Sequence, residues 1–344
     1  MRWYGGGDIE KDTTIQSTVS FYLTLLTLIS FMSPTKQRRQ NAYLMSSSPI
    51  TIKHTKSGAQ FTIYPYGAHV TSIKTTEGKE LLFLSKDAIL DGSKAIRGGI
   101  PLCFPQFGQP DKSMPQHGFL RNNYWTEVPN SRFDDDESAG ISMELSLKDV
   151  VNSRGGKWDT DTKLDAKCTY TVKIFPNGFT TTICMSNLGE ESFNFQVLLH
   201  NYFLVQDRMA LNGDVCNVKG LEGYAVDDKV SGEKYVCDKP VTIPQKLIID
   251  RVYDPPKETI DLNLTISAGP SNNLSLTASG EVDGKPVSVS GVVWNPHEEK
   301  ARGMGDFGDD QYYDMICVEP GLLTDVPLLE GGKQATFTQT VKCV

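Results

Sequence analysis

The stretch CTYTVKIFPNGFTTTICM, residues 168–185, decides the fold class of this chain. From residue 168 to residue 174 apolar and polar residues alternate, which is the pattern of a β-strand with one buried face. Phe-Pro-Asn-Gly at 175–178 is a turn sequence, and residues 179–185 then lead the chain back. The stretch therefore predicts an antiparallel β-hairpin.

The same period of two continues from residue 50 onward, whereas helical periodicity is nearly absent. Residues 222–261 are rich in Lys, Asp and Pro and are expected to form excursions between strands. Further strands are expected at residues 61–64, 141–147, 193–205, 262–266, 274–278 and 287–294. Many short strands without long helices favour an all-β fold, a large antiparallel β-sandwich or barrel, over a parallel sheet.

The composition is that of a globular, acidic chain. Its 344 residues carry a formal net charge of -8, and 39% are hydrophobic, enough for a full core in one large domain. The acidic balance argues against nucleic acid as the main partner, because backbone phosphates would be repelled. The seven cysteines have neither CxxC nor Cys/His ligand spacing. They are expected to be reduced thiols of a cytoplasmic protein without structural zinc.

Residues 1–44 differ from the rest of the chain. Residues 20–32, SFYLTLLTLISFM, are largely apolar, too short a run to span a bilayer comfortably but about the size of a signal-peptide core. The preceding segment carries Asp8, Glu10 and Asp12 instead of a net positive charge. We therefore expect an N-terminal extension over 1–44, either disordered or an organellar targeting segment, a folded domain over 45–344, and no stable membrane association.

Two histidines and one glutamate are candidates for acid/base chemistry. His200 alternates with apolar neighbours in FNFQVLLHNYFLV, so it projects from a polar face opposite the core, either into a groove or as an ordinary surface histidine. His117 precedes Gly118 and lies near Arg121, which offers a fork of donors; a loop histidine bonded to backbone is the alternative. Glu319 ends an apolar run before a Pro-Gly turn, at a strand rim where a solvated glutamate would also lie.

Cofactor motifs do not accompany these candidates. GMGDFG, residues 303–308, has the spacing of a dinucleotide-binding loop, but no strand-then-helix pattern surrounds it. GxSxG, HExxH and Walker A sequences are absent from the chain.

RGGIPLCFPQFG, residues 97–108, fits neither a helix nor a central strand, because it combines adjacent glycines with two prolines. Five further motifs follow it along the chain: QHGFLRNNYW, LLHNYF, DRVY, VVWNP and ICVEPG. In this order the six motifs resemble the glucose-6-phosphate 1-epimerase branch of the aldose 1-epimerase family, over about residues 50–342. The resemblance implies a β-sandwich of galactose mutarotase-like type, in agreement with the strand pattern.

The resemblance also assigns roles to seven residues. It implies that His200 and Glu319 are the catalytic pair, with ionised Glu319 as base on an anomeric hydroxyl and protonated His200 as acid on the ring oxygen. The nearby carboxylate is expected to help keep the imidazole charged. The substrate-binding residues that it implies are Arg97, Gln116, His117, Arg121 and Asp250.

The implied activity is interconversion of the α and β anomers of a hexose 6-phosphate, with glucose 6-phosphate the first choice, by a monomer without metal or cofactor. Arg97 and Arg121 would offer paired donors to the phosphate, while Gly98 and Gly99 would let the backbone come close to the ligand. Two alternatives stay open: a non-catalytic carbohydrate-binding protein of the same fold, and a mutarotase for free aldoses.

Overall fold

The hairpin predicted at residues 168–185 is present and longer than the pattern required. In the computed structural model, which describes residues 48–151 and 154–344, β8 (Ala166–Phe175) pairs antiparallel with β9 (Gly178–Asn187). Alternate side chains of β8 are buried, so the sequence alternation covers one face of the strand. The predicted extension over 1–44 lies outside the described residues.

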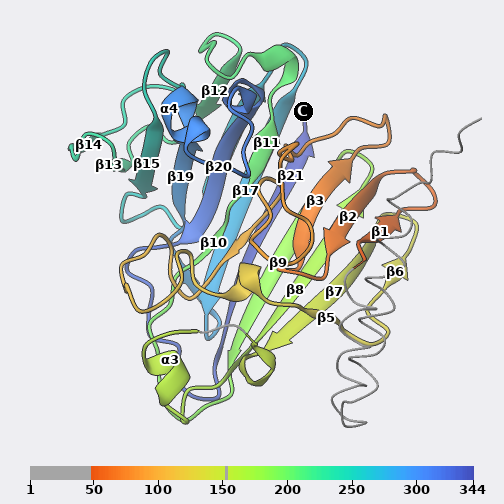
Figure 1. Ribbon diagram of the computed structural model, residues 1–344, viewed down its shortest axis with the longest axis vertical. Helices are drawn as coiled ribbons and strands as arrows, with labels where there is room; N and C mark the ends of the chain where they lie inside the picture. The colour runs from red at the N-terminus through yellow and green to blue at the C-terminus, as the bar shows by residue number, and fades with distance from the viewer. Residues whose placement is uncertain (1–47, 152–153) are drawn as a thin grey trace, which may run out of the picture. The chain divides into compact units, whose positions relative to one another are not determined.

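β8 and β9 belong to a ten-stranded antiparallel sheet (Figure 1). Its order is β12-β16-β17-β21-β9-β8-β7-β5, with β18 paired to β17 and β6 paired to β7. The remaining strands are β5 (Thr126–Glu127), β6 (Phe133–Asp134), β7 (Ala139–Ser146), β12 (Cys216–Lys219), β16 (Leu262–Ala268), β17 (Asn273–Val282), β18 (Lys285–Val287) and β21 (Gln334–Cys343).

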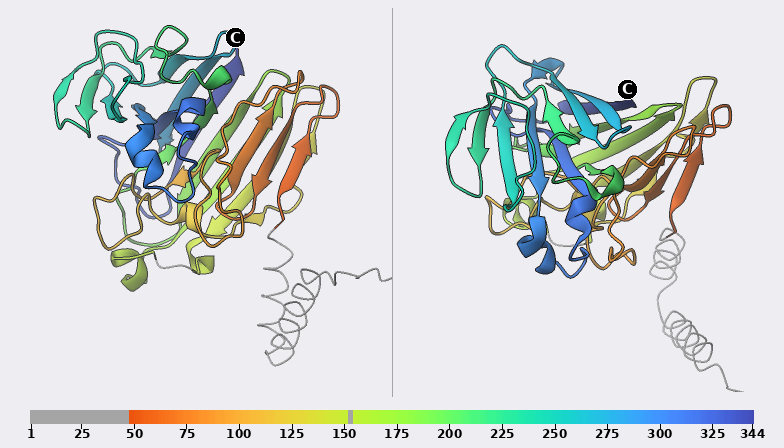
Figure 2. Two further views of the ribbon diagram at one scale, coloured as in Figure 1. Left: turned by 45° about the horizontal axis from the view of Figure 1, so that its top comes forward. Right: turned by 90° about the horizontal axis from the view of Figure 1, so that it is seen from above.

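An eight-stranded antiparallel sheet has the order β14-β13-β15-β19-β20-β10-β4, with β11 paired to β20. Its strands are β4 (Leu102–Cys103), β10 (Val197–Leu199), β11 (Tyr202–Leu204), β13 (Ala225–Asp228), β14 (Lys234–Val236), β15 (Ile249–Asp254), β19 (Ser290–Asn295) and β20 (Met315–Leu322). A third sheet consists of β1 (Ile50–Lys53), β2 (Gln60–Tyr64) and β3 (His69–Lys74), drawn in orange beside the green strands in Figures 1 and 2.

The two large sheets pack against each other around the hydrophobic core. Leu322 of β20 lies so close to Gly280 of β17 that a side chain at position 280 would collide with it. Asn201 and Gln339 of β21 connect the sheets by reciprocal amide hydrogen bonds of 2.8 and 2.9 Å. The predicted all-β antiparallel sandwich is therefore confirmed.

Two strand predictions were wrong in detail. Residues 193–205 form not one strand but β10 and β11, which are separated at His200 and Asn201. At the break the Asn201 backbone N–H donates to the Leu199 carbonyl at 2.9 Å instead of to a neighbouring strand, while the side-chain amide donates to Gln339 and to the Val318 carbonyl (Nδ2 to O, 3.0 Å).

The segment predicted as a strand over 287–294 crosses between sheets, because β18 pairs with β17 whereas β19 pairs with β15 and β20. Residues 222–261 are also more regular than predicted: they supply β13, β14 and β15 to the eight-stranded sheet. Their charged residues concealed these strands, because several of them face a cavity instead of the core.

Within the described residues helices are few and short, in agreement with the near absence of helical periodicity. They are η1 (Leu120–Asn122), η2 (Leu147–Asp149), α3 (Lys157–Thr160), η3 (Gln206–Arg208), α4 (His297–Arg302) and η4 (Gln311–Asp314). Among the described residues, we find no helix with the length and apolar character needed to cross a membrane.

Candidate active site

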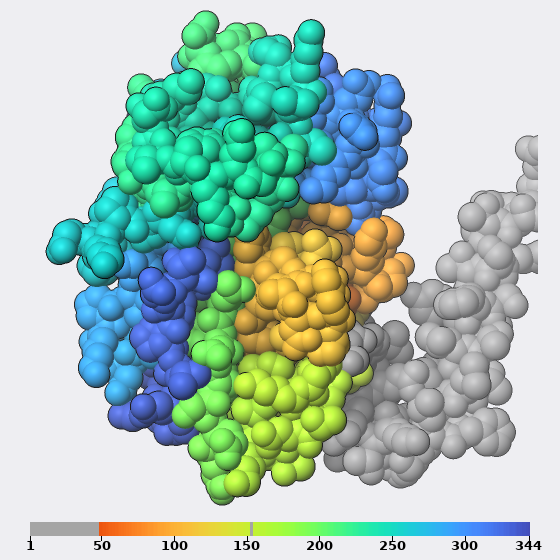
Figure 3. Space-filling view, turned by 90° about the vertical axis from the view of Figure 1, so that its left-hand side faces the viewer, coloured from red at the N-terminus to blue at the C-terminus, as the bar shows by residue number. Residues whose placement is uncertain are grey.

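The eight-stranded sheet forms the floor of a cavity of about 730 Å³. In β20, Leu322 faces the core, so Glu319, three positions away, faces the opposite side and the cavity. Figure 3 shows the face on which the orange-to-yellow loops, the teal segment of β13–β15 and the blue segment containing α4 meet. The cavity brings together all seven residues that the sequence predicted for the site: Arg97, Gln116, His117, Arg121, His200, Asp250 and Glu319.

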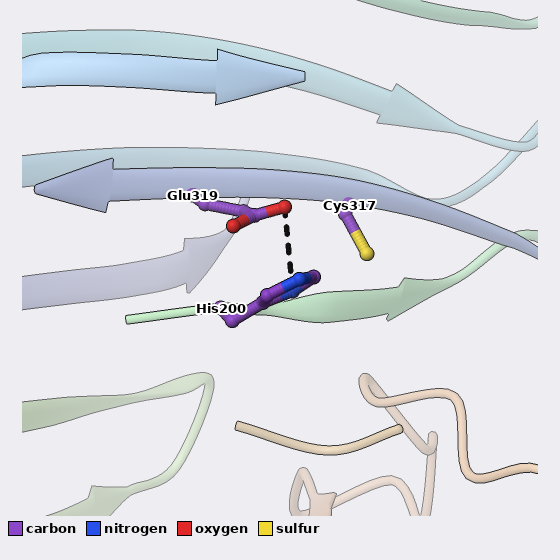
Figure 4. A group of neighbouring side chains, drawn as sticks. All are labelled: His200, Cys317 and Glu319. Atoms are coloured by element: carbon purple, nitrogen blue, oxygen red, sulfur yellow. Dashed lines mark ion pairs between the residues drawn. The ribbon is translucent and has the colours of Figure 1, made fainter. Parts of the chain in front are cut away.

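His200 and Glu319 form the centre of this cavity. His200 Nδ1 lies 3.3 Å from Glu319 Oε1, as Figure 4 shows. The His200 ring stacks on Tyr202 with 4.8 Å between ring centroids, and it lies in a T-shaped arrangement with Trp294, with 6.0 Å between ring centroids. The backbone N–H of His200 donates to the Pro101 carbonyl at 3.1 Å, and this hydrogen bond fixes the backbone at the break between β10 and β11.

The polar atoms of this pair are buried without hydrogen-bond partners. Glu319 is 1% exposed, and neither of its carboxylate oxygens has a hydrogen-bond partner among the described residues. His200 Nδ1 is in the same state, because its contact with Glu319 has ion-pair distance but not hydrogen-bond geometry. Buried polar atoms are normally satisfied, so these three atoms are available to a ligand.

Burial changes the charge state that the sequence led us to expect for the pair. Burial and the nearby Asp250 raise the pKa of Glu319 well above its ordinary value, against an opposing effect of Arg121. Burial lowers the pKa of His200 well below its ordinary value, and His117, Arg121 and Arg97 lower it further. The structure therefore contradicts the expectation that the carboxylate keeps the imidazole charged, because burial and the neighbouring cations outweigh the effect of the carboxylate.

His117 is fixed in a neutral form above the pair. Its Nδ1 accepts a hydrogen bond from the Gly108 N–H at 3.1 Å, which leaves the proton of the neutral ring on Nε2. Burial, with Arg121 as the next cause, lowers the pKa of His117 well below its ordinary value. Its ring lies edge-on to His200 at 5.7 Å. His117 can therefore act as a hydrogen-bond donor to a ligand in the cavity.

Two guanidinium groups lie in the cavity wall. Arg97 Nε donates to Asp306 Oδ1 at 3.3 Å, and its Nη1 donates to the Tyr202 hydroxyl at 3.1 Å. Arg121 Nη2 donates to the Gln116 carbonyl at 3.0 Å, while its Nε is buried and has no hydrogen-bond partner. Among residues 48–151 and 154–344, Arg121 has no carboxylate within ion-pair distance. Its positive charge is therefore available to an anion.

The glycines of the RGG motif do not have the role that we expected. Gly98 and Gly99 have φ of 110° and 62°, in the region that favours glycine. A Cβ atom on Gly98 would lie 2.5 Å from the Phe83 carbonyl oxygen, and one on Gly99 would collide with the Val70 carbonyl oxygen. The glycines thus allow close packing against the protein's own backbone instead of close approach of a ligand, and so fix the position of Arg97.

Asp250 lies on β15 and also lines the cavity. Its carboxylate is 3.5 Å from Lys300 Nζ, and Lys300 lies over the Trp294 ring at 5.7 Å from the centroid. Burial raises the pKa of Asp250, against the lowering effect of Lys300. The prediction from the sequence did not include Tyr202, Trp294 or Lys300, although Tyr202 and Trp294 stand in the LLHNYF and VVWNP motifs that were noted.

One group of side chains could also hold a metal ion. The donor atoms of His200, Cys317 and Glu319 lie within 4.8 Å of one another, because Cys317 and Glu319 are two residues apart on one face of β20 (Figure 4). Burial, with Glu319 as the next cause, raises the pKa of the Cys317 thiol well above its ordinary value. A thiol must lose its proton to bind a metal, so a metal at this group would have to displace the Cys317 proton.

Comparison with known proteins identifies the family. The family described as aldose 1-epimerase matches residues 48–342. The chain belongs to the aldose 1-epimerase family. A relative from Cenchrus ciliaris, named "Putative glucose-6-phosphate 1-epimerase", is 32% identical over 278 residues, 79% of this chain and 78% of the relative. A protein of the same name from Escherichia coli strain K12 is 30% identical over 325 residues, 92% of this chain and 96% of the relative.

Solved structures of this family share the fold. The crystal structure of a "putative mutarotase" from Salmonella typhimurium matches with a TM-score of 0.65 at 26% identity, covering 86% of this chain and 90% of that chain. The crystal structure of the "GalM/aldose Epimerase Homologue" from C. elegans matches with a TM-score of 0.58 at 13% identity, which shows the fold alone. The predicted galactose mutarotase-like fold is confirmed.

Proposed function

We propose that this aldose 1-epimerase interconverts the α and β anomers of a hexose 6-phosphate, with glucose 6-phosphate as the preferred substrate. The observation that carries the proposal is that Arg121, a cation without a carboxylate partner among the described residues, shares one cavity with the His200–Glu319 pair. A phosphate monoester supplies the anion that Arg121 lacks, and the pair supplies acid/base chemistry. The names of the relatives from Cenchrus ciliaris and Escherichia coli support this substrate.

The reaction needs one proton to leave the anomeric hydroxyl and one to reach the ring oxygen. Loss of the first and gain of the second breaks the bond between the anomeric carbon and the ring oxygen and gives the open aldehyde. Rotation about the bond between the first two carbons and reversal of both transfers closes the ring on the other face. In this proposal Glu319 accepts the first proton and His200 donates the second. Each group is expected to accelerate the reaction by about 10²-fold to 10⁴-fold.

Substrate binding supplies the charge state that this division of roles needs. Burial, together with His117, Arg121 and Arg97, lowers the pKa of His200, and burial favours a protonated Glu319. A phosphate carrying about -1.5 to -2 charges would offset the two guanidinium groups. One proton then moves from Glu319 to His200 without exchange with solvent, because the two groups are 3.3 Å apart. The charged pair thus forms when the phosphorylated substrate is bound.

Other residues of the cavity orient the sugar in this proposal. Asp250 accepts hydrogen bonds from ring hydroxyls, and the neutral His117 donates one. The Gln116 side chain lies in the same wall and can pair with a hydroxyl in either direction. The Trp294 and Tyr202 rings give the sugar an apolar surface on which its C–H groups can pack.

The proposal is tested by NMR measurement of anomer exchange with wild-type protein, in glucose 6-phosphate and in free glucose. We expect clear acceleration above the uncatalysed rate for glucose 6-phosphate and a much smaller effect for glucose. Equal acceleration of the two sugars would favour a mutarotase for free aldoses. Binding of glucose 6-phosphate without acceleration would leave a non-catalytic carbohydrate-binding protein.

Replacement of Cys317 by Ser separates acid/base chemistry from a metal-dependent alternative. The thiol lies beside the pair but takes no part in either proton transfer, so we expect Cys317→Ser to keep kcat for glucose 6-phosphate within about threefold, since an isolated small change near a site alters the barrier little. A metal held by His200, Cys317 and Glu319 would lose a ligand in this variant. A loss of activity that added zinc restores would therefore reject the metal-free mechanism.

We further propose that the protein is a cytoplasmic monomer without nucleic-acid or membrane partners, unless residues 1–44 direct it to an organelle. The seven free cysteines, five of them buried, support a reducing compartment. The net charge of -8 supports the absence of a nucleic-acid partner.

A further inference from the structure

The segment 303–308 lies against the part of the cavity wall that contains Arg97. Its Asp306 is buried, with a side chain that is 1% exposed, and its two carboxylate oxygens face two different cations. Oδ1 accepts from Arg97 Nε at 3.3 Å, and Oδ2 lies 2.9 Å from Lys94 Nζ. Burying a carboxylate without a cationic partner would cost folding free energy, and here the two cations offset that cost.

Asp306 fixes the direction in which the Arg97 fork points. A guanidinium has five N–H donors in one plane. Asp306 holds the Nε side of this plane, and the Tyr202 hydroxyl holds Nη1, so rotation about the side-chain torsions is blocked at two points. Nη2 has no hydrogen-bond partner among the described residues, and Arg97 lines the cavity. A fixed fork of this kind suits a phosphate, which it can meet with paired hydrogen bonds.

The charges around Asp306 explain why a carboxylate at this position does not cancel Arg97. The ion pair with Lys94 and the attraction to Arg97 lower the pKa of Asp306 in spite of its burial, so it is ionised. Lys94, Asp306 and Arg97 then carry a combined charge of +1, and Arg121 adds a second positive charge. This sum matches the charge of about -1.5 to -2 on a phosphate monoester at neutral pH. Lys94, Arg97 and Arg121 also line a second cavity of about 460 Å³, so all three cations border one region.

We propose that Asp306 is a positioning residue for substrate phosphate: it holds the Arg97 guanidinium in place, while Lys94 restores the positive charge that Asp306 would otherwise cancel. This inference rests on the proposed function, because it assigns a role within the same phosphate site. The inference assigns a role to GMGDFG, residues 303–308, which has the spacing of a dinucleotide-binding loop but lacks the surrounding strand-then-helix pattern.

The segment has anchors of its own, so its fold does not depend on Asp306. The Phe307 ring packs against Phe83 at a centroid distance of 5.6 Å. Gln311, just beyond the segment, accepts a hydrogen bond from the Lys86 backbone N–H at 3.1 Å. Replacement of Asp306 by Asn, which is nearly the same size, should therefore leave the protein folded.

The test is the Asp306→Asn variant, with Asp310→Asn as its matched control. Asp310 follows in the same loop, but it pairs with Arg208 at the surface and does not line either cavity. For Asp306→Asn we expect KM for glucose 6-phosphate to rise about 10-fold to 100-fold, the effect of losing a hydrogen bond to a charged group, with kcat nearly unchanged. Calorimetry should give the same increase in the Kd of inorganic phosphate. Asp310→Asn should change neither constant.

A purely structural role would give a different result. It would lower the thermal midpoint and the active fraction, and hence kcat, while KM and the phosphate Kd stayed at wild-type values; that outcome overturns the proposal. Lys94→Met provides a second arm, because it leaves Asp306 to cancel Arg97: the phosphate Kd should rise, whereas Lys86→Met, also a surface lysine, should not change it. An unchanged Kd in Lys94→Met overturns the charge-balance part.

Failure of the proposed function is distinguishable from failure of this inference. Wild-type protein that does not accelerate exchange of glucose 6-phosphate would reject the function, and the phosphate Kd values would still decide the role of Asp306. Active wild-type protein with an unchanged Asp306→Asn variant would reject only the positioning role.

Discussion

Anomer exchange of glucose 6-phosphate is expected to slow by about 10²-fold to 10⁴-fold when His200 is replaced by Asn or Glu319 by Gln, the usual contribution of one acid/base group. Both replacements keep a polar side chain of similar size but cannot take up and release a proton at neutral pH. Exchange between the α and β signals in NMR spectra, after subtraction of the uncatalysed rate, measures the effect. The double variant should be about as slow as the slower single variant, since the two groups act on one reaction as a unit.

His297→Asn is the matched control for the histidine variant. His297 begins α4 in the same domain, its Nε2 lies 3.1 Å from the Gln245 carbonyl, and it does not line the cavity. It should keep the wild-type rate. Wild-type rates in both His200→Asn and Glu319→Gln would show that the reaction does not use this pair. A thermal midpoint close to wild type confirms that a slow variant is folded.

The strands could be predicted from the sequence because their signal is local. Residues 168–174 alternate apolar and polar side chains, and one face of β8 is buried as a result. The break at His200 and Asn201 has no such signal, and the Asn201 side chain there contacts Gln339, 138 residues further along the chain. The crossing between sheets near residue 288 is likewise set by the strands on either side, not by the local pattern.

The members of the site could be named from the ordered motifs, but their physical state could not. Asp306 is separated from Arg97 by 209 residues and stands in a segment that resembles a nucleotide loop, so nothing in the sequence connects the two. The pKa directions of His200 and Glu319 depend on burial, which the sequence does not contain. The role of Gly99 depends on the Val70 carbonyl, which approaches it only in the folded chain.

Replacement of Arg121 by Met should remove most of the preference for the phosphorylated sugar. We expect kcat/KM for glucose 6-phosphate to fall about 10²-fold to 10³-fold, because two charge-assisted hydrogen bonds to phosphate are lost. The rate with free glucose should stay near its wild-type value, because glucose has no group that needs this cation. Anomer exchange of both sugars, measured by NMR over a range of concentrations, separates these effects.

The stability of Arg121→Met distinguishes a binding residue from a structural one. Arg132→Met is the matched control: Arg132 is 53% exposed and pairs with Glu127 at 2.7 Å, so its loss should affect neither sugar. Because the buried Nε of Arg121 has no hydrogen-bond partner among the described residues, the apolar Met side chain should raise the thermal midpoint measured without added substrate, or at least not lower it. An arginine that served the fold would give a lower midpoint and equal losses on both sugars. A higher midpoint together with a selective loss on glucose 6-phosphate would mean that the chain keeps an unpaired cation, at some expense of stability, for the phosphate of its substrate.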